Sequence, residues 1–389
     1  MLKKAKRTAV FVLVVAFVVL LCFALSDNYL LVSSALIIIL LLGLLIWSLI
    51  RTKNIQDKVK ADFRLKTFVN NLKRELDGAS TVFIMGHKFS DLDSLGASYG
   101  LYYALRDKYS VKLVANKQNT LARPLVDFLR FSDSHCKIYN FEEIKDLIDD
   151  NSLLIVVDTH RPSIMDYVEL YNRVKNVVVI DHHLKSSEFA NKAKLFYMQT
   201  KASSVCEIVT AMFGVLNIKT LETVAATALL SGIMLDTKNF VMNTASSTFS
   251  AAAFLRRFRA DPVLIKKMFS ETVDVCKRKY EIVTSVSLYE NFAFARTDTD
   301  DRYTRISTAQ AADELLAING VIASFVMCPS DGKINISARS YGDVDVEKIM
   351  SKIGGGGHKT AAACQVEGKT FEEIDNMLKC AIDEYKKER

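Results

Sequence analysis

Residues 81–96 read TVFIMGHKFSDLDSLG, an apolar run followed by a loop with ionisable side chains. The run TVFIMG is short and rich in strand-forming residues, which predicts a buried β-strand. His87 follows it directly, and Asp91 and Asp93 come shortly after. In open parallel sheets ligands bind beyond the carboxyl ends of the strands. This stretch therefore predicts an α/β domain with a polar site at one edge of its sheet.

Three similar runs follow, at Val111–Ala115, Leu153–Asp158 and Val177–Asp181. Helical patterns lie between them, as at Ser94–Tyr109 and Phe141–Asp149. Strands that alternate with helices predict a parallel sheet with buried strands. Helical patterns then dominate, at Ser203–Leu216, Leu221–Leu235 and Ser246–Phe258.

We predict five parts of the chain from these patterns. They are a transmembrane helical hairpin at 1–50, a helical stalk at 51–78, a larger α/β domain at 79–260, a helical connector at 261–300 and a smaller α/β domain at 301–389. The last part has strand-like runs at Gly320–Cys328 and Lys333–Arg339 and a final helical pattern near Phe371–Lys386.

The predicted hairpin rests on two apolar runs, Ala9–Leu25 and Leu30–Ile50, which contain no charged residue. A bilayer-spanning helix needs about 20 apolar residues. A cleaved signal peptide is the main alternative for the first run, but residues 26–28 lack a small-x-small cleavage site and a second apolar run follows at once.

The flanks of the hairpin predict its orientation. Lys3, Lys4, Lys6 and Arg7 precede the first run, and Arg51 and Lys53 follow the second. Basic flanks stay on the cytoplasmic side, so we expect a multi-pass protein of the cell membrane with both α/β domains in the cytoplasm. In the stalk, Leu65, Phe68, Leu72 and Leu76 have helical spacing. Either a dimerising stalk or a lone amphipathic helix that packs on the next domain fits this spacing.

Charge and cysteine content exclude several classes of protein. The formal net charge of the 389 residues is +7, which is modest for a binder of long nucleic acid. The seven cysteines are scattered and include no CxxC pair. A disulfide framework or a cysteine-based zinc module is therefore not expected, and a reducing cytoplasm fits better.

Ionisable residues also follow two further strands and one helix. They are Asp158 and His160 after LLIVV, Asp181, His182 and His183 after VVVI, and Asp236 after ALLSGIML. One such residue alone is commonly a helix cap or a turn residue. Several of them at neighbouring strand ends favour a shared site at one edge of the sheet.

The residue types of this cluster predict a metal site. Carboxylates and imidazoles without a thiolate suit Mn²⁺ or a related divalent ion better than structural zinc. Six ligands are too many for one ion that keeps positions open for water and substrate, so we expect two ions. The carboxylates of Asp91, Asp93, Asp158 and Asp236 would repel one another without metal, and some would protonate.

These motifs resemble those of a known family. HKFSDLD, VVDTH, VIDHH and GIMLD resemble the successive motifs of the DHH phosphoesterase superfamily, and GGGGH with SAR upstream resembles its DHHA1 substrate-binding domain. VVDTHRPS and the hairpin resemble the membrane-anchored cyclic-di-AMP phosphodiesterases in particular. The 28 residues from 51 to 78 leave no room for the PAS and GGDEF modules that those proteins usually carry.

The resemblance implies a role for each matching residue. One metal ion would be held by His87, Asp91 and Asp158, and the other by Asp93, Asp158, His182 and Asp236, with Asp158 bridging. Asp181 would orient His182, and His183 would contact the scissile phosphate. The role of His160 stays open between a partner of a ligand, a substrate contact and a turn residue.

The C-terminal motif implies a substrate-binding role for Arg339, Gly354, Gly355, Gly356, Gly357 and His358. Glycines let the backbone approach a phosphate or a base closely, and arginine offers a planar fork for phosphate. The alternatives are a flexible linker for the glycine run and a plain surface position for the arginine.

The resemblance implies a two-metal phosphodiesterase that converts cyclic di-AMP to 5′-pApA. The expected partners are the cyclic dinucleotide, the lipid bilayer and a second copy of the chain as a homodimer, with no long nucleic acid. An oligoribonuclease or pAp phosphatase on the same scaffold is the nearest alternative. An inorganic pyrophosphatase and a non-catalytic nucleotide sensor are the others.

Overall fold

The computed structural model describes residues 63–301 and 304–388. They form two compact units, of which the first ends at Pro262 and the second begins at Val263. The predicted membrane hairpin and residues 51–62 of the predicted stalk lie outside the described residues. Within the described ranges, no helix combines the length and the apolar character that crossing a bilayer requires.

A six-stranded sheet forms the centre of the first unit, with strand order β3-β2-β1-β4-β5-β6. All of its neighbouring strands are parallel. The strands are β1 (Val82–Met85), β2 (Val111–Val114), β3 (Ile138–Tyr139), β4 (Leu153–Val157), β5 (Asn176–Asp181) and β6 (Leu195–Met198). The predicted parallel α/β fold is confirmed. The sequence patterns did not indicate the edge strands β3 and β6.

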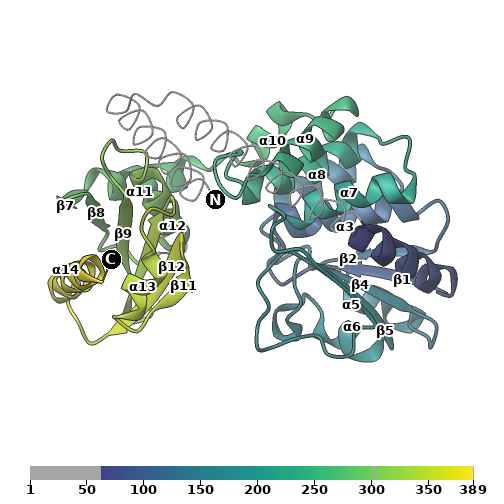
Figure 1. The fold of residues 1–389 in the computed structure, drawn as a ribbon, viewed down its shortest axis with the longest axis horizontal. Helices are drawn as coiled ribbons and strands as arrows, with labels where there is room; N and C mark the ends of the chain where they lie inside the picture. The colour runs from purple at the N-terminus through teal and green to yellow at the C-terminus, as the bar shows by residue number, and fades with distance from the viewer. Residues whose placement is uncertain (1–62, 302–303, 389) are drawn as a thin grey trace, which may run out of the picture. The chain divides into compact units, whose positions relative to one another are not determined.

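Helices cover both faces of this sheet (Figure 1), with α3, α7 and α8 on one side and α5 and α6 on the other. The bounds are α3 (Leu92–Leu105), α4 (Arg123–Ser132), α5 (Phe141–Ile144), α6 (Val168–Arg173), α7 (Val205–Leu216), α8 (Thr223–Asp236) and α9 (Ser246–Arg257). The next helix, α10 (Pro262–Met268), begins at the last residue of the first unit and otherwise belongs to the second. Short 3₁₀ turns lie at Lys145–Leu147 and Pro162–Ile164.

The central strands are apolar along their whole length because both faces are covered. All residues of β1 and β4 are buried. Successive side chains of each strand point to opposite faces. Phe83, Leu154 and Val177 point to the α6 side, where they pack in one core with Leu170. This arrangement explains why these strands appear in the sequence as continuous apolar runs.

Glycines bring α3 and α8 into close contact. A Cβ on Gly96 would lie 2.5 Å from Ala228 O, and a Cβ on Gly232 would lie 2.6 Å from Asp93 Cα and 2.7 Å from Asp93 Oδ1. Distances this short leave no room for a side chain. The packing of α8 therefore fixes the first turn of α3, which carries Asp93.

Residues 63–77 form a helix that packs on the first unit. Phe68, Leu72 and Leu76 are buried, and the ring of Phe68 lies 5.1 Å from the ring of Tyr197 in β6. Lys73 Nζ donates a hydrogen bond to Val215 O at 3.3 Å. Of the two interpretations of the stalk, the amphipathic helix packed on the next domain describes these residues.

The second unit is built on a six-stranded mixed sheet with order β11-β12-β10-β9-β8-β7. The pair β8 and β9 is parallel, and the other neighbours are antiparallel. The strands are β7 (Ser287–Tyr289), β8 (Phe292–Arg296), β9 (Ala323–Ser330), β10 (Lys333–Ser340), β11 (Gly356–His358) and β12 (Ala361–Glu367). The helices are α11 (Val273–Thr284), α12 (Thr304–Leu315), α13 (Val346–Ser351) and α14 (Phe371–Lys387).

The prediction of a helical connector at 261–300 needs correction. The segment is helical in α10 and α11, but β7 and β8 belong to the second sheet. In β8, Phe292 and Phe294 pack in one core, whereas Ala293 and Ala295 pack in another with Ala311 of α12. This alternation is typical of a strand covered on both faces, and three to five residues are too few to stand out beside two helices.

Candidate metal centre

The predicted ligands lie where the strand order reverses, between β1 and β4. His87 and Asp91 follow β1, Asp158 follows β4 directly, and His182 follows the next strand, β5. This point of an open parallel sheet is where a crevice for ligands forms. The topology therefore brings residues from distant parts of the chain to one place.

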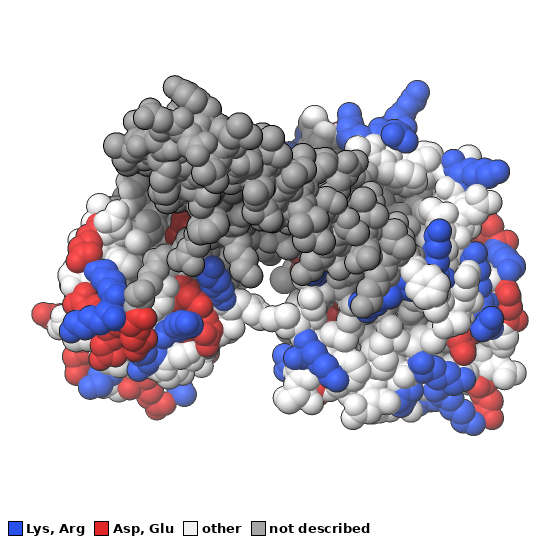
Figure 2. Space-filling view, viewed as in Figure 1, with Lys and Arg blue, Asp and Glu red and all other residues white. Residues whose placement is uncertain are grey.

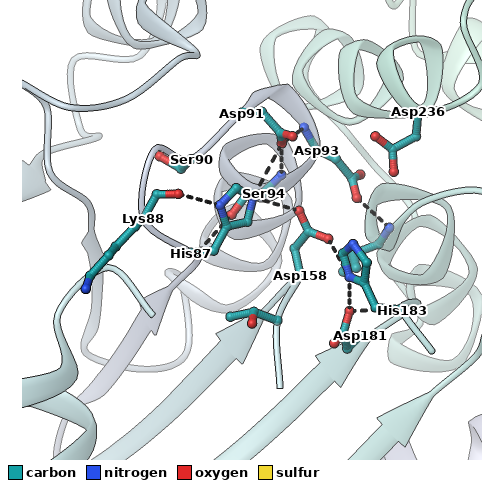
Figure 3. A network of polar contacts seen from close by, with 12 residues as sticks. His87, Lys88, Ser90, Asp91, Asp93, Ser94, Asp158, Asp181, His183 and Asp236 are labelled. Atoms are coloured by element: carbon teal, nitrogen blue, oxygen red, sulfur yellow. Dashed lines mark hydrogen bonds and ion pairs between the residues drawn. The ribbon is translucent and has the colours of Figure 1, made fainter. Parts of the chain in front are cut away.

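His87, Asp91 and Asp158 form the first group, in which one donor atom from each residue lies within 4.8 Å of the others. His87 Nε2 lies 3.3 Å from Asp158 Oδ2 and 3.9 Å from Asp91 Oδ1 (Figure 3). Its Nδ1 lies 2.7 Å from Lys88 O. Because a carbonyl oxygen only accepts, Nδ1 carries a proton, and Nε2 faces the carboxylates as a free ligand atom.

Asp93, His182 and Asp236 form a second group, in which one donor atom from each residue again lies within 4.8 Å of the others. His182 Nε2 lies 3.3 Å from Asp236 Oδ2 and 3.5 Å from Asp158 Oδ1. Asp158 therefore connects the two groups. A third group joins Asp158 and His182 with His183.

Asp158 has two features that fit a metal ligand. Its φ is +61°, in the left-handed region that few non-glycine residues adopt. Its Oδ1 is buried and accepts no hydrogen bond from the described residues. A buried carboxylate oxygen without a partner is unfavourable, and a cation would supply the partner. The donor set of carboxylate oxygens and imidazole nitrogens suits a divalent ion, so the residues present fit such a metal.

The surroundings of the ligand groups other than Asp158 favour their protonated forms. For Asp158 burial opposes ionisation, but the neighbouring rings of His182 and His87 lower its pKa. Burial raises the pKa of Asp236 to about 10, reinforced by the charges of Asp93 and Asp158. Burial opposes protonation of His182, but the nearby carboxylate of Asp158 and the charge of Asp93 outweigh it and raise its pKa to about 10. Burial also raises the pKa of Asp93, to about 7. Metal ions would displace these protons, as is general for carboxylate and imidazole ligands.

Asp91 and Asp93 also cap helices, which is a common role of such residues after a strand. Asp91 Oδ1 accepts hydrogen bonds from the N–H groups of Asp93 and Ser94 at 3.0 Å each, at the start of α3. Asp93 Oδ2 and Oδ1 accept from the N–H groups of Val205 and Cys206 at 2.7 and 2.8 Å, at the start of α7. These bonds orient both carboxylates and leave further lone pairs for a cation.

Replacing Gly232 by alanine is expected to destabilise the protein by about 1–3 kcal/mol, because overpacking forces neighbours to move. Since Asp93 is one of those neighbours, the variant should also lose affinity for divalent ions. Chemical denaturation and a metal-dependent thermal shift measure the two effects.

Gly214 provides the matched control. It lies in α7, and a Cβ added there would have nothing within 4 Å. Alanine at this position should therefore leave metal affinity unchanged and stabilise the helix by up to about 1 kcal/mol. Equal metal affinity in the Gly232 variant and the wild type would contradict the link between helix packing and Asp93.

The expected role of Asp181 in orienting the ring of His182 is wrong in its detail. Asp181 Oδ1 accepts from the backbone N–H of His182 at 2.7 Å, but the ring of His182 has Ala202 O near its Nδ1, at 3.4 Å. The ring that Asp181 orients is that of His183, whose Nδ1 lies 2.8 Å from Asp181 Oδ1. The reason is geometric. His182 and His183 are the two residues that follow β5, and their side chains point in different directions.

His160 is the residue whose role the sequence left open. It is buried, and its Nδ1 lies 2.5 Å from Asp181 Oδ2. Its Nε2 accepts a hydrogen bond from the N–H of Ser186 at 3.0 Å. His160 therefore supports Asp181 and makes no direct contact with the metal groups. The signals in the sequence were its place two residues after Asp158 and its inclusion in the motif VVDTH.

The predicted substrate-binding residues lie in the second unit. In the register of β10, β12 and β11, Arg339 lies opposite Ala361, and Ala361 lies opposite His358. The three side chains therefore share one face of the sheet, with the small alanine in the middle. Arg339 Nε lies 3.4 Å from Asp313 Oδ1 of α12.

The glycine run is ordered in this sheet, so the flexible-linker interpretation is excluded. Gly356, Gly357 and His358 form β11. A Cβ on Gly355 would lie 2.6 Å from Ala363 O, and one on Gly357 would lie 2.5 Å from Ala361 O. These two glycines are needed for close packing on β12, whereas Gly356 is exposed and has open space around it.

Charge on the second unit also bears on its ligands. On the face shown in Figure 2, its acidic and basic side chains are interspersed. Where its described side chains are visible in that view, the second unit has no continuous basic track of the kind that long nucleic acid would require.

The fold and the site together define an α/β protein with a carboxylate–histidine cluster that could hold metal at the switch point of a parallel sheet, and with a smaller mixed-sheet domain. Residues 81–233 match the family model for the DHH family, N-terminal domain, and residues 288–387 match the model for the DHHA1 domain. The chain therefore contains a DHH domain followed by a DHHA1 domain, as the motifs predicted.

Two curated relatives illustrate the range of similarity. The chain is 38% identical to the cyclic-di-AMP phosphodiesterase GdpP of Geobacillus thermodenitrificans, over 83% of this chain and 50% of that protein. It is 27% identical to the bifunctional oligoribonuclease and PAP phosphatase NrnA of Mycoplasma genitalium, over 74% of this chain and 89% of that protein. The chain thus spans about half the length of GdpP.

A solved structure has the same fold. An exopolyphosphatase-related protein from Bacteroides fragilis superposes with a TM-score of 0.69 at 18% identity, covering 82% of this chain and 96% of that one. At this level of identity, the likeness concerns the fold.

Proposed function

We propose that this chain is a metal-dependent phosphodiesterase that hydrolyses cyclic di-AMP to pApA. The observation that carries the proposal is the convergence of the ligand groups on Asp158, whose buried Oδ1 has no hydrogen-bond partner among the described residues. The name of the relative that shares 38% identity over most of this chain supports the substrate.

The proposal includes two divalent ions, with Mn²⁺ as the candidate. One would be held by His87, Asp91 and Asp158, and the other by Asp93, Asp158, His182 and Asp236. The charges support two ions, because four ionised carboxylates balance two divalent cations. When bound, such ions supply an activated water and stabilise charge on the phosphoryl oxygens.

His183 has the position and hydrogen bonding of a substrate contact. Its side chain is 50% exposed, and its Nδ1 donates to Asp181, which fixes the ring and leaves Nε2 free. We infer that a protonated Nε2 donates a hydrogen bond to a phosphoryl oxygen and so stabilises developing negative charge. Burial opposes the charged form, but the hydrogen bond to Asp181 and the charge of Asp158 raise the pKa of His183.

The second unit would bind the rest of the dinucleotide. Arg339 offers a bidentate donor for a phosphate, and His358 lies on the same sheet face. In this proposal Gly354 and Gly356 give the substrate access to the backbone, since both have open space where a side chain would be. Gly355 and Gly357 hold that segment on β12.

Attachment to the cytoplasmic face of the cell membrane is part of the proposal. Its support is the pair of apolar runs in residues 1–50 and their basic flanks. A homodimer is also part of the proposal. Phe68, Leu72 and Leu76 are buried within the first unit, so the dimer interface would be formed by other residues. Membrane fractionation of the full chain and of a chain without residues 1–50 tests the attachment.

The second candidate is an oligoribonuclease or pAp phosphatase, which the relative NrnA favours. The test is the detergent-purified full chain with Mn²⁺ and a panel of cyclic di-AMP, cyclic di-GMP, pApA and pAp, followed by chromatography. We expect cyclic di-AMP to be consumed and pApA to accumulate. Faster cleavage of pApA or pAp than of the cyclic substrate would favour the second candidate.

The same panel separates an enzyme from a nucleotide sensor and from an inorganic pyrophosphatase. A sensor would bind cyclic di-AMP without turnover. A pyrophosphatase would release phosphate from pyrophosphate. The complete set of ligand side chains argues against a sensor, because each predicted ligand belongs to one of the groups described above.

A further inference from the structure

Phe89 has an unusual backbone conformation for a bulky residue. Its φ is +56°, in the left-handed region that large L-residues rarely adopt. Hydrogen bonds on both sides hold it there. The N–H of Lys88 donates to Ile164 O at 2.7 Å, and Ser90 O accepts from the N–H of Leu121 at 2.9 Å. Strain that the surroundings impose in this way is concentrated at functional sites.

Phe89 is also exposed, together with an apolar residue on each side. Phe89 is 58% exposed, Leu121 is 66% exposed and Ile164 is 37% exposed. They come from the three segments that follow β1, β2 and β4. The two backbone hydrogen bonds place them in the order Leu121, Phe89, Ile164. We refer to these three residues as the apolar strip.

The apolar strip lies beside the metal centre. Phe89 is two residues from His87 and two residues from Asp91, which both belong to the first ligand group. The other two members follow the strands on either side of β1. A large aromatic side chain exposed at this place is not explained by folding, because a polar residue would fit the same backbone better.

We propose that the apolar strip is a nucleobase platform, on which a purine of the substrate stacks against Phe89 while Leu121 and Ile164 flank the base. This inference rests on the proposed function for the identity of the ligand. Every base has a flat π-face, and stacking on an aromatic ring is tolerant of sequence. The platform would therefore position the dinucleotide without distinguishing adenine from guanine, since the strip's side chains carry no polar group.

The test uses the metal-loaded full chain and linear pApA in which one adenine is replaced by fluorescent 2-aminopurine, whose emission falls when the base stacks on an aromatic ring. The wild type and Phe89→Tyr should quench the emission on binding. Phe89→Asn should bind the probe about tenfold to a hundredfold more weakly and lose the quenching. With cyclic di-AMP as substrate, KM should rise more than kcat falls.

Asparagine is chosen because it tolerates the left-handed backbone, so Phe89→Asn should melt at the wild-type temperature or above. If this variant binds the probe more weakly without being destabilised, Phe89 acts as a ligand contact and not as a residue needed for folding. Phe131→Ala is the matched control, because Phe131 is 86% exposed at the end of α4 and should leave binding and quenching unchanged.

Two results would overturn the inference. The first is wild-type probe affinity and quenching in Phe89→Asn. The second is lost activity with unchanged quenching, which would indicate that the strip faces protein and not a base. The experiment distinguishes failure of this inference from failure of the proposed function. If the wild type quenches the probe but does not hydrolyse cyclic di-AMP, the platform is supported and the proposed activity is not.

Discussion

Replacing Asp158 by asparagine is expected to lower metal-dependent hydrolysis of cyclic di-AMP by about a hundredfold to a thousandfold or more. Asp158 belongs to two of the three ligand groups, and His182, which lies 3.5 Å from it, joins it to the group of Asp93 and Asp236. Loss of its charge therefore affects both ion positions at once. No other single residue of the described site connects His87 with Asp236 in this way.

Asparagine is the informative substitution because of the backbone. At φ +61° asparagine is tolerated, whereas alanine adds strain that would lower stability for a reason unrelated to metal. The amide also keeps the shape of the carboxylate. The folded structure should therefore persist, and the loss of activity can be attributed to the missing charge.

Two measurements check this prediction, steady-state turnover and the rise in melting temperature on adding Mn²⁺. An ion that binds only the folded state stabilises it in proportion to its affinity, so the Mn²⁺-dependent shift should shrink in Asp158→Asn. Asp150→Asn, at a side chain that is 81% exposed, should behave as the wild type. An unchanged shift together with unchanged turnover would remove the bridging role from Asp158.

The ligand positions were predictable because each lies close to the end of a regular element. Val156 pairs with Met85 of β1 and with Val179 of β5, so the residues that follow these strands meet without any further assumption. When a strand can be recognised in the sequence as an apolar run, the position of its carboxyl end is therefore known as well. The family motifs added the grouping of the ligands, which spacing alone does not give.

Other features depend on contacts that a local pattern does not contain. β3 has two residues and β6 lies at the opposite edge, so neither forms the long buried run that marks a central strand. The pairing of His160 with Asp181 joins residues 21 positions apart. The positive φ at Phe89 is imposed by hydrogen bonds to two other loops.

Asp181→Asn is expected to destabilise the protein by about 1–3 kcal/mol, the cost of one buried donor without an acceptor, and to reduce activity about tenfold to a hundredfold through the ring of His183. Asp181 is fully buried. Its Oδ1 accepts hydrogen bonds from the backbone N–H groups of His182 and His183 and from His183 Nδ1. Its Oδ2 accepts from His160 Nδ1.

The expected loss follows from the tautomer of His160. Its Nε2 accepts from the N–H of Ser186 at 3.0 Å, so the proton of the neutral ring is on Nδ1, which faces Asp181. In the asparagine variant the carbonyl oxygen would occupy the Oδ1 position, where three donors converge. The new NH₂ group would then face the N–H of His160. Moving the ring proton to Nε2 would only transfer the conflict to Ser186, so one donor–donor contact remains in either tautomer.

Chemical denaturation measures the stability change, and the pH profile of turnover separates a structural effect from a chemical one. If Asp181 sets the protonation of His183, the profile of Asp181→Asn should shift to lower pH, because the ring loses the carboxylate that raises its pKa. Asp107→Asn, at a side chain that is 97% exposed, should change neither stability nor profile. A wild-type denaturation midpoint in Asp181→Asn would mean that His160 carries its proton on Nε2 and that Asp181 does not hold both rings.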